Sequence, residues 1–599
     1  MTAATARAGR DAGSTGAADP GAAPGAAPSP DAAPANANTA SAEAQGAGVG
    51  STPTAGPGGS VAPGALPREV GKWTVTVSIA FGALMATIDT SIVNVAMPQI
   101  RGELGASLQE ITWITTAYMI AMVLIMPLTG FLGSFFGQKR VYLASLVLFT
   151  IGSVLCGTAR SLEMLVLWRI LQGLGGGALQ PTQQAILRQT FPPEEQGMAM
   201  AVFSMVIMVG PAVGPVLGGW ITDNYSWPWI FFFVNLPVGV LGIYLTFRNV
   251  HEPADVLAAN RAKAAIARKN LDWAGIALMA VAIGALQYVL EEGPSEDWFE
   301  STRILAGSYV AGIGLCAFVI RELTATAPVV DLRMFRDATF ASGTVIAGVV
   351  FAMLMGSMFL LPVFTQEMMR FSSTEAGVML LPRTITMMIA SPFVGRLYNQ
   401  IRSSVLVGFG LVVTALGCWM QADINLSTSS ADLRIPLAVT GIGFAFLFVP
   451  ITTAALSNVA RHELAGAASV NSFVRQVGGS IGLSIFANLF TTYSRDAATG
   501  LAQNVSMLRP EVAAQAMATR ASMIGHGLTP DLAGAMTQKM LAGRTMLQGT
   551  VIGFDKTFVL QTIAFIVVIP LLLFLRVKRT PAAGAQAPEA SREVAMHLE

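Results

Sequence analysis

Residues 73–97 read WTVTVSIAFGALMATIDTSIVNVAM, and Asp89 is the only charged side chain in this apolar run. An α-helix rises about 1.5 Å per residue, so the run is long enough to cross a hydrocarbon core of roughly 30 Å. A carboxylate near the middle of such a helix is unfavourable in lipid unless it is paired, hydrated or protonated. Asp89 is therefore either a functional residue or a structural carboxylate that pairs with a neighbouring arginine.

The rest of the chain follows the same apolar pattern. Hydrophobic residues make up 53% of the 599 residues and charged residues 12%, which is roughly half the charged fraction of an ordinary soluble protein. The apolar residues are grouped in blocks that approach or reach the length of a membrane span, which predicts an all-α polytopic membrane protein. The fourteen predicted spans are residues 73–97, 111–131, 141–158, 162–185, 199–221, 230–246, 273–290, 304–320, 340–364, 376–394, 405–420, 437–456, 467–490 and 558–575.

Positive charges are unevenly distributed between the two sets of short loops. One set, together with the segment after the last span, is rich in Lys and Arg, and the positive-inside rule makes this side cytoplasmic. Both termini are then cytoplasmic, and the predicted location is the cytoplasmic (inner) membrane. The short loops on the opposite side hold only Arg101, Arg160, Arg303, Arg370 and Arg434.

Three segments lie outside the predicted spans. Residues 1–67 are rich in Ala, Gly and Pro, and this composition predicts a disordered cytoplasmic tail. Residues 580–599 form a second cytoplasmic tail. Residues 493–556 form a long connection on the outer side, with mixed charge and an expected helical content.

Landmark Gly and Pro residues recur along the chain at a slowly drifting offset of 264 to 269 residues. This regularity predicts two parallel six-helix halves, residues 68–250 and 337–579, related by an axis along the membrane normal. Residues 251–336 supply two further helices between the halves, so the expected arrangement is 6 + 2 + 6. The recurring pairs are Pro98 and Pro362, Pro127 and Pro392, Gly130 and Gly395, Pro181 and Pro450, Gly197 and Gly466, and Gly210 and Gly479.

Several polar residues inside the spans are candidates for a transport pathway. A lone arginine within a membrane needs a partner or water, which applies to Arg169, Arg383 and Arg475. Asn94 and Gln172 are uncharged candidates in the first and fourth spans.

The fifth span contains GPAVGPVLGG at residues 210–219. Small residues allow helices to approach closely, and proline bends a helix. This pattern is typical either of a helix that seals the pathway in one state or of ordinary close packing. The residues concerned are Gly210, Gly214, Pro215, Gly218 and Gly219.

Three further stretches stand out: IDTSIVNVAMP at 88–98, GFLGSFFGQKR at 130–140 and RILQGLGGG at 169–177. Together with the fifth-span run, they resemble the first-span, loop, fourth-span and fifth-span motifs of the major facilitator superfamily, and specifically of its fourteen-helix drug:proton antiporter family of EmrB/QacA type. WPWIF at 227–231, NLP at 235–237 and RQVGG at 475–479 are similar to the EmrB branch. The loop motif assigns Gly130, Gly137, Lys139 and Arg140 to the cytoplasmic end. It departs from the family at Ser134, where an acidic residue is usual.

The resemblance implies multidrug efflux, as in antibiotic resistance: export of hydrophobic or amphipathic compounds by alternating access, driven by the proton gradient without a cofactor. In this fold the first and fourth helices are neighbours, so we expect Asp89 to pair with Arg169 and to exchange the coupling proton. The glycine run of the fifth helix is then expected to limit proton leak. EmrB-type relatives imply a periplasmic adaptor and an outer-membrane channel as partners, besides small substrates, protons and lipid.

Two other functions remain open. One is the transport of a single metabolite on the same fold, because fold does not fix substrate. The other is a membrane receptor or scaffold. An enzyme is not indicated, because the sequence contains no nucleophile–base constellation and no Cys/His spacing of a metal site. The net charge of +1 without a basic patch gives no sign of a nucleic-acid partner.

Overall fold

The computed structural model describes residues 71–252, 272–326, 328–369, 371, 373–425 and 428–574. The predicted tails, residues 1–67 and 580–599, and most of the loop that opens the inserted segment lie outside these residues. Throughout the described part the regular structure is helical, as the sequence predicts.

The first half contains six long helices, in agreement with the predicted spans. The sixth begins with a π-helical turn, η1, that runs directly into α7. A short helix, α2 (Leu108–Ile111), links the first two long helices. The long helices are α1 (Lys72–Leu104), α3 (Trp113–Phe136), α4 (Gln138–Gly157), α5 (Leu162–Thr190), α6 (Gln196–Asn224) and η1 (Phe231–Asn235) with α7 (Leu236–Asn249).

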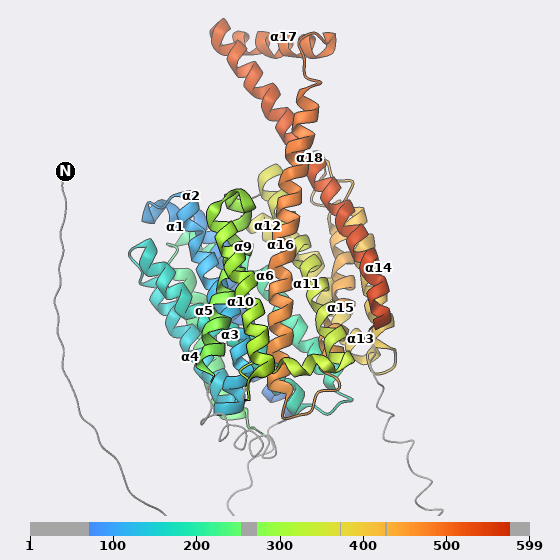
Figure 1. Cartoon of the computed structure of the whole chain (residues 1–599). Coiled ribbons are helices and arrows are strands. Elements are labelled where there is room, and N and C mark those ends of the chain that lie inside the picture. Colours follow the sequence, from blue (N-terminus) through green and yellow to red (C-terminus); the bar gives the residue numbers. More distant parts are fainter. Residues whose placement is uncertain are drawn as a thin grey trace, which may run out of the picture. The chain divides into compact units, whose positions relative to one another are not determined.

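The inserted pair and the second half follow in the predicted order. The pair is α9 (Trp273–Glu292) and α10 (Thr302–Thr324). The second half consists of α11 (Ala338–Val363), α12 (Ser373–Met379) with α13 (Leu381–Leu397), α14 (Ser403–Met420), α15 (Arg434–Ala455), α16 (Leu464–Ala502) and α18 (Pro530–Val568). Figure 1 shows these helices side by side in one bundle.

Within the described residues, twelve helices are long and apolar enough to cross a membrane. Helices α5 and α16 are not among them, although both are long and pack between other helices of the bundle. Helix α5 is less apolar because it carries several polar side chains, including Arg169, Gln172 and Gln183. These side chains are buried against protein and do not face lipid. The twelve helices together with these two are compatible with fourteen spans.

The two halves meet through a pair of equivalent contacts at the end of the bundle where α1 begins. A Cβ added at Gly130 of α3 would lie 2.6 Å from Gly466 Cα of α16, and one added at Gly395 of α13 would lie 2.9 Å from Gly197 O of α6. Gly130 corresponds to Gly395 in the repeat, and Gly197 corresponds to Gly466. The same pair of repeat positions is therefore in contact twice, in exchanged order, which is the geometry of a two-fold repeat.

The inserted pair lies against the seam between the halves. Helix α9 packs against α3 of the first half and α16 of the second, and α10 packs mainly on α9. Two buried hydrogen bonds fix this position: Thr116 Oγ1 donates to Glu292 Oε1 over 2.9 Å, and Gln287 Nε2 donates to Ser480 Oγ over 2.9 Å.

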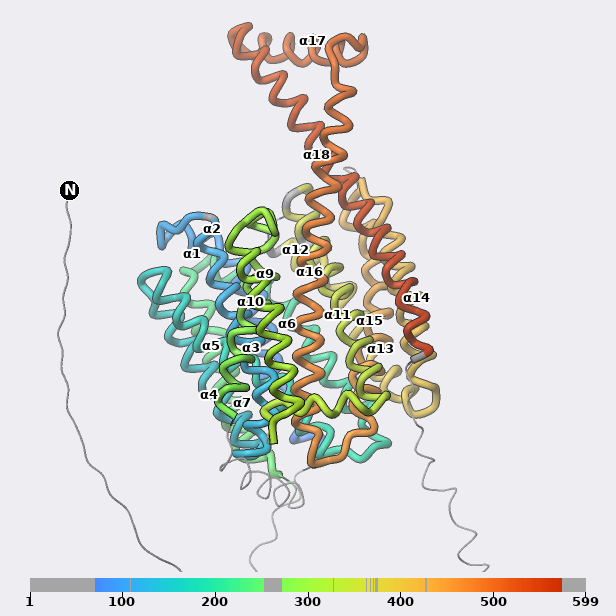
Figure 2. The backbone as a smooth tube through the Cα atoms, viewed as in Figure 1, coloured from blue at the N-terminus to red at the C-terminus, as the bar shows by residue number. Residues whose placement is uncertain are grey.

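The long connection predicted at residues 493–556 is mostly helical. Helix α16 continues to Ala502, α17 (Pro510–Gly525) follows, and α18 begins at Pro530. Figures 1 and 2 show α17 and the adjoining turns of α16 and α18 beyond the ends of the other helices. Glycines at the crossing allow close contact, since a Cβ added at Gly549 would lie 2.7 Å from Ala498.

Candidate functional site

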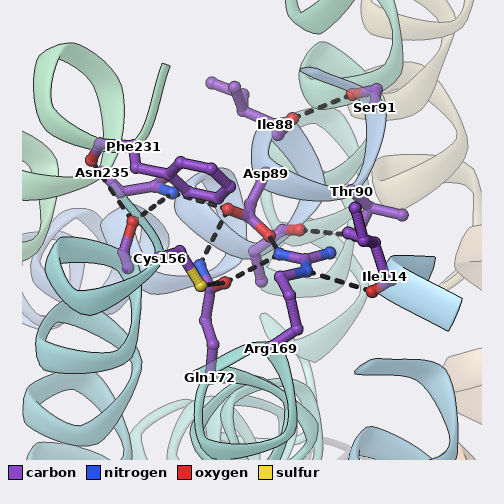
Figure 3. Close-up of polar contacts among 12 residues, drawn as sticks. Ile88, Asp89, Thr90, Ser91, Ile114, Cys156, Arg169, Gln172, Phe231 and Asn235 are labelled. Atoms are coloured by element: carbon purple, nitrogen blue, oxygen red, sulfur yellow. Dashed lines mark hydrogen bonds and ion pairs between the residues drawn. The ribbon is translucent and has the colours of Figure 1, made fainter. Parts of the chain in front are cut away.

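Asp89 lies at the centre of a buried polar network in the first half (Figure 3). Its side chain is fully buried, and its Oδ2 lies 2.6 Å from Nη1 of Arg169 on α5. The other carboxylate oxygen, Oδ1, accepts hydrogen bonds from Gln172 Nε2 at 2.8 Å and from Asn235 Nδ2 at 2.6 Å. Both carboxylate oxygens thus accept from side-chain donors of neighbouring helices.

Arg169 is equally well held. Its Nη1 donates to Gln172 Oε1 at 2.7 Å, and its Nε donates to the Ile114 carbonyl at 3.3 Å. The guanidinium carbon lies 4.1 Å from the centre of the Tyr118 ring, which adds a cation–π contact. A charge of each sign is therefore buried here with its hydrogen bonds largely satisfied, and this is the condition under which a buried ion pair is tolerated.

Helix packing brings this network together. Gly152 of α4 lets α5 approach, because a Cβ there would lie 2.8 Å from Gln172 Cα. Asn235 is the last residue of the π-helical turn η1, and its Nδ2 also donates to Ser153 Oγ at 2.9 Å. Pro237 follows two residues later and has no backbone N–H, so regular α-helical bonding is interrupted at this point. Residues from α5 and η1 therefore converge on the α1 carboxylate, and Ser153 of α4 holds Asn235 in place.

A cavity of about 310 Å³ lies between the two halves. Helices α1 and α6 supply one wall, and α11, α12 and α13 supply the other. Its volume is within the range of small-molecule sites. The lining is mostly apolar, with a few polar groups that include Ser91, Asn94, Gln366 and Arg383. Ser91 and Asn94 lie on the same helix as Asp89, so the cavity and the ion pair share α1.

The glycine run of α6 packs against this part of α1. Cβ atoms added at Gly210 and Gly214 would collide with Thr87 and Ser91, and one at Gly218 would lie 2.8 Å from Ile92. Ser91 Oγ also donates to the Gly210 carbonyl at 3.1 Å. The run therefore permits very close contact between α6 and α1.

The other two members of the run differ in position. Pro215 lines the cavity. Gly219 is buried within α6.

The predicted loop motif lies at the end of the bundle where α1 begins. Gly137 has φ +93°, a left-handed conformation that favours glycine. Lys139 Nζ donates to the Phe247 carbonyl at 2.8 Å, and its backbone N–H donates to Glu252 Oε1 at 2.7 Å. Arg140 is exposed. These contacts join α4 to the end of α7 and do not cross between the halves.

Different residues connect the halves at this end. Arg188 of α5 donates to the Leu456 carbonyl at 3.3 Å and also to the Thr453 carbonyl, both on the second half. Asn399 Nδ2 donates to the Glu194 carbonyl. Ser134, where the family usually has an acid, donates only to Phe131 O within its own helix. The contacts between the halves at this end are therefore made by residues other than Ser134.

The predicted polar residues thus separate into three places. Gln172 belongs to the Asp89 network. Asn94 and Arg383 line the cavity. Arg475 lies apart, with its guanidinium over the Phe351 and Phe448 rings and Nη1 within 3.3 Å of Thr452 Oγ1.

Comparisons with known proteins agree with this architecture. The sequence profile of the Major Facilitator Superfamily matches residues 79–483. The chain belongs to this superfamily. The Multidrug export protein EmrB of Haemophilus influenzae is 33% identical over 515 residues, which cover 86% of this chain and 96% of that protein. The Fatty acid resistance protein FarB of Neisseria gonorrhoeae is 33% identical over 498 residues, covering 83% and 95%.

A solved structure supports the fold independently. The human organic anion transporter MFSD10 aligns with a TM-score of 0.52 at 14% identity, covering 84% of this chain and 99% of that one. Together with the relatives, it confirms the predicted major facilitator fold. The resemblance to EmrB-type members of the superfamily is confirmed as well.

Sequence analysis missed three members of the Asp89 network: Asn235, Ser153 and Tyr118. Asn235 stands out in the sequence as part of the NLP motif, and an amide inside an apolar span is itself a signal. Ser153 and Tyr118 carry no such signal, because single Ser and Tyr residues are common in membrane helices. Only the packing of the helices shows that Tyr118 contacts Arg169 and that Ser153 bonds to Asn235.

Proposed function

We propose that this protein exports hydrophobic or amphipathic toxic compounds across the cytoplasmic membrane and takes up protons in exchange. The observation that carries the proposal is the buried Asp89–Arg169 pair, located beside a cavity between two repeated halves in a chain related to EmrB-type multidrug exporters. Ionisable side chains in the membrane interior are energetically costly, so a pair that is present there is by default a candidate for function.

Asp89 is the proposed proton carrier. In this conformer Asp89 is buried and its carboxylate accepts hydrogen bonds from three side chains, so a proton reaches it only when α1 separates from α5 and η1. Protonation removes the negative charge and with it the attraction to Arg169. Because α1 also lines the cavity through Ser91 and Asn94, its movement changes the cavity. Proton uptake and substrate binding are thereby linked through one helix.

Alternating access requires that each end of the bundle close in turn. The contacts Gly130–Gly466 and Gly197–Gly395 close the end where α1 begins. In the proposed cycle these contacts break in the other state, and the tight packing of the α6 glycine run on α1 limits proton leak. In this proposal Arg169 and Gln172 surround the proton site on one side of α1, and the residues that line the cavity form the substrate pathway on the other side.

The proposed location is the inner membrane, with both termini in the cytoplasm. The extension formed by α17 and the adjoining turns of α16 and α18 then projects into the periplasm and is a candidate docking site for an adaptor that leads to an outer-membrane channel. Its support is an unusual exposure of apolar side chains for an aqueous segment: Leu508 is 93% exposed, and Met517 and Met546 are each 70% exposed. Photocrosslinking from Met517 in cells tests this; crosslinks to lipid alone contradict it.

The export proposal is tested with purified full-length protein in proteoliposomes. An imposed proton gradient should drive accumulation of drug-like compounds, and addition of a compound should in turn release or take up protons. A susceptibility panel with and without the gene separates the alternatives: hypersensitivity to many unrelated compounds supports multidrug export, and hypersensitivity confined to one compound supports a dedicated transporter. Absence of proton movement with every compound would support a receptor or scaffold.

A further inference from the structure

Glu291 and Glu292, the last two residues of α9, place two adjacent carboxyl groups within the bundle. Glu292 is only 8% exposed, and Glu291 is partly buried. Glu292 bonds to Thr116 in the first turn of α3, whereas Gly130, which contacts α16 where the bundle is closed, lies near the other end of that helix. The two carboxyl groups are therefore at the end of the bundle opposite the closing contacts.

The two carboxyl groups are connected to both halves of the protein. On one side, Thr116 Oγ1 of α3 donates to Glu292 Oε1 over 2.9 Å. On the other side, Gln287 Nε2 donates to Glu291 Oε1 over 2.7 Å and to Ser480 Oγ of α16 over 2.9 Å. Helix α9 thus holds one carboxyl group against the first half and the other, through Gln287, against the second half.

These hydrogen-bond partners are suited to both protonation states of a carboxyl group. The Thr116 hydroxyl donates to a carboxylate and can instead accept from a protonated carboxyl, and an amide does the same when its oxygen and nitrogen exchange places. Gln287 is fully buried, and its Oε1 accepts no hydrogen bond from the described residues in the present orientation. The Arg169 partner of Asp89, by contrast, can only donate. Glu291 and Glu292 can therefore gain a proton while their partners stay bonded.

The electrostatic surroundings favour one bound proton. Two adjacent ionised carboxylates with little water around them repel each other, and one proton removes this repulsion. Thr116 and Ser480 bring uncharged hydroxyls from α3 and α16. The charged or titratable groups beside the two carboxyls are Tyr288 of α9, Glu296 at the end of the 3₁₀ helix η2 (Gly293–Glu296), and Arg303 of α10. Arg303 is 82% exposed and pairs with Glu296 at 3.7 Å, so solvent screens most of its charge.

We propose that Glu291 and Glu292 form a second proton-binding site, separate from Asp89, that binds a proton when α3, α9 and α16 are packed together and releases it when they separate. Separation admits water to the carboxyl groups, and water stabilises their charged forms. A ligand that binds one arrangement more tightly stabilises that arrangement. Acid therefore favours the packed arrangement, and base favours separation. This inference needs no substrate and goes beyond the export proposal.

The test measures the separation of α3 and α16 at this end of the bundle as a function of pH. Spin labels are introduced through Gln109→Cys in α2 and Asn488→Cys in α16, both at exposed positions, in a Cys316→Ser background that removes the exposed native thiol. Full-length protein in nanodiscs is examined without substrate by pulsed electron resonance between about pH 5 and about pH 8. The ratio of the long-distance to the short-distance population should rise with pH, by up to about tenfold per pH unit, because the two arrangements differ by one bound proton.

Three variants of this labelled protein assign the response. Glu291→Gln combined with Glu292→Gln keeps the size of the side chains but binds no proton, so it should show the low-pH distribution at every pH. Glu300→Gln removes an exposed carboxyl from the segment that follows α9 and should respond as the labelled parent does. Asp89→Asn should also keep the response, because the proposed site is separate from Asp89.

The outcomes separate this inference from the export proposal. A labelled parent that does not respond to pH, a double variant that responds as the parent does, or a response lost in Asp89→Asn or Glu300→Gln would overturn the second site. A double variant whose distribution differs from the parent already at low pH would assign the two carboxyl groups a structural role and would also overturn it. Export itself is tested by substrate-driven proton flux, and a failure there leaves the pH response of the substrate-free protein to be judged by itself.

Discussion

Replacement of Gly130 by alanine tests the closed end of the bundle. The added Cβ would lie 2.6 Å from Gly466 Cα and 2.7 Å from Ser469 Oγ. Carbon atoms in contact are normally about 3.5–4.0 Å apart, so α3 and α16 must separate by about 1 Å. Overpacking of this kind costs about 1–3 kcal/mol. The cost falls on the closed conformer alone, because in the proposed cycle this contact is broken in the other state.

A cost of this size changes the conformational equilibrium constant by about five- to one-hundred-and-fifty-fold in favour of the open end. In a Cys316→Ser background, which removes the exposed native thiol, spin labels introduced through Phe136→Cys and His462→Cys, at exposed positions close to the ends of α3 and α16, report the separation by pulsed electron resonance. Gly130→Ala should increase the population with the longer distance. Gly284→Ala in α9, whose Cβ would meet nothing within 4 Å, is the matched control. An unchanged distance distribution in Gly130→Ala would refute the reasoning.

Two further predictions concern polar contacts. Asn235→Leu removes a donor that lies 2.6 Å from Asp89 Oδ1. A hydrogen bond to a charged group is worth about 1.5–3 kcal/mol, so substrate-driven proton flux should fall about tenfold or more; unchanged flux would remove Asn235 from the site. Arg321→Gln removes the main cause of the lowered pKa of Asp272, its hydrogen bonds and ion pair with the Arg321 guanidinium. Because that pKa is lowered in the folded state, the pair stabilises the protein above about pH 4 and its contribution is lost as the pH falls through the folded-state pKa. Arg321 is half-exposed and solvent screens the pair, so the variant should show a small fall in the midpoint of thermal unfolding in detergent at pH 7 and no change at low pH.

Much of the architecture could be predicted from the sequence because each helix that crosses lipid needs an apolar block of about twenty residues. Apolar blocks identified the spans, and the recurring Gly and Pro residues identified the halves. Which of the repeated positions contact each other is visible only in the structure, where Gly130 contacts Gly466 and Gly197 contacts Gly395. Sequence spacing gives the equivalence of two positions, but it does not tell which of them touch.

The candidate site was predictable in part. Asp89, Arg169 and Gln172 stand out because charged and amide groups are rare inside spans, and the structure brings all three together. The relation between Asn94 and Arg383 was not predictable, because they belong to different halves and share only a cavity. Likewise, Arg169, which has a carboxylate partner, and Arg383, for which the described residues offer no ion pair, look alike in the sequence. The difference depends on which side chains the neighbouring helices present.

The most direct test of the account is the effect of Asp89→Asn on proton movement in proteoliposomes that contain the full-length protein. Asparagine keeps the size of the side chain and cannot take up the coupling proton. The account predicts that substrate-driven proton flux is abolished, while exchange of labelled for unlabelled substrate, which requires no net proton movement, persists and shows that the variant is folded. Full proton-coupled export by Asp89→Asn would contradict the role assigned to this carboxylate.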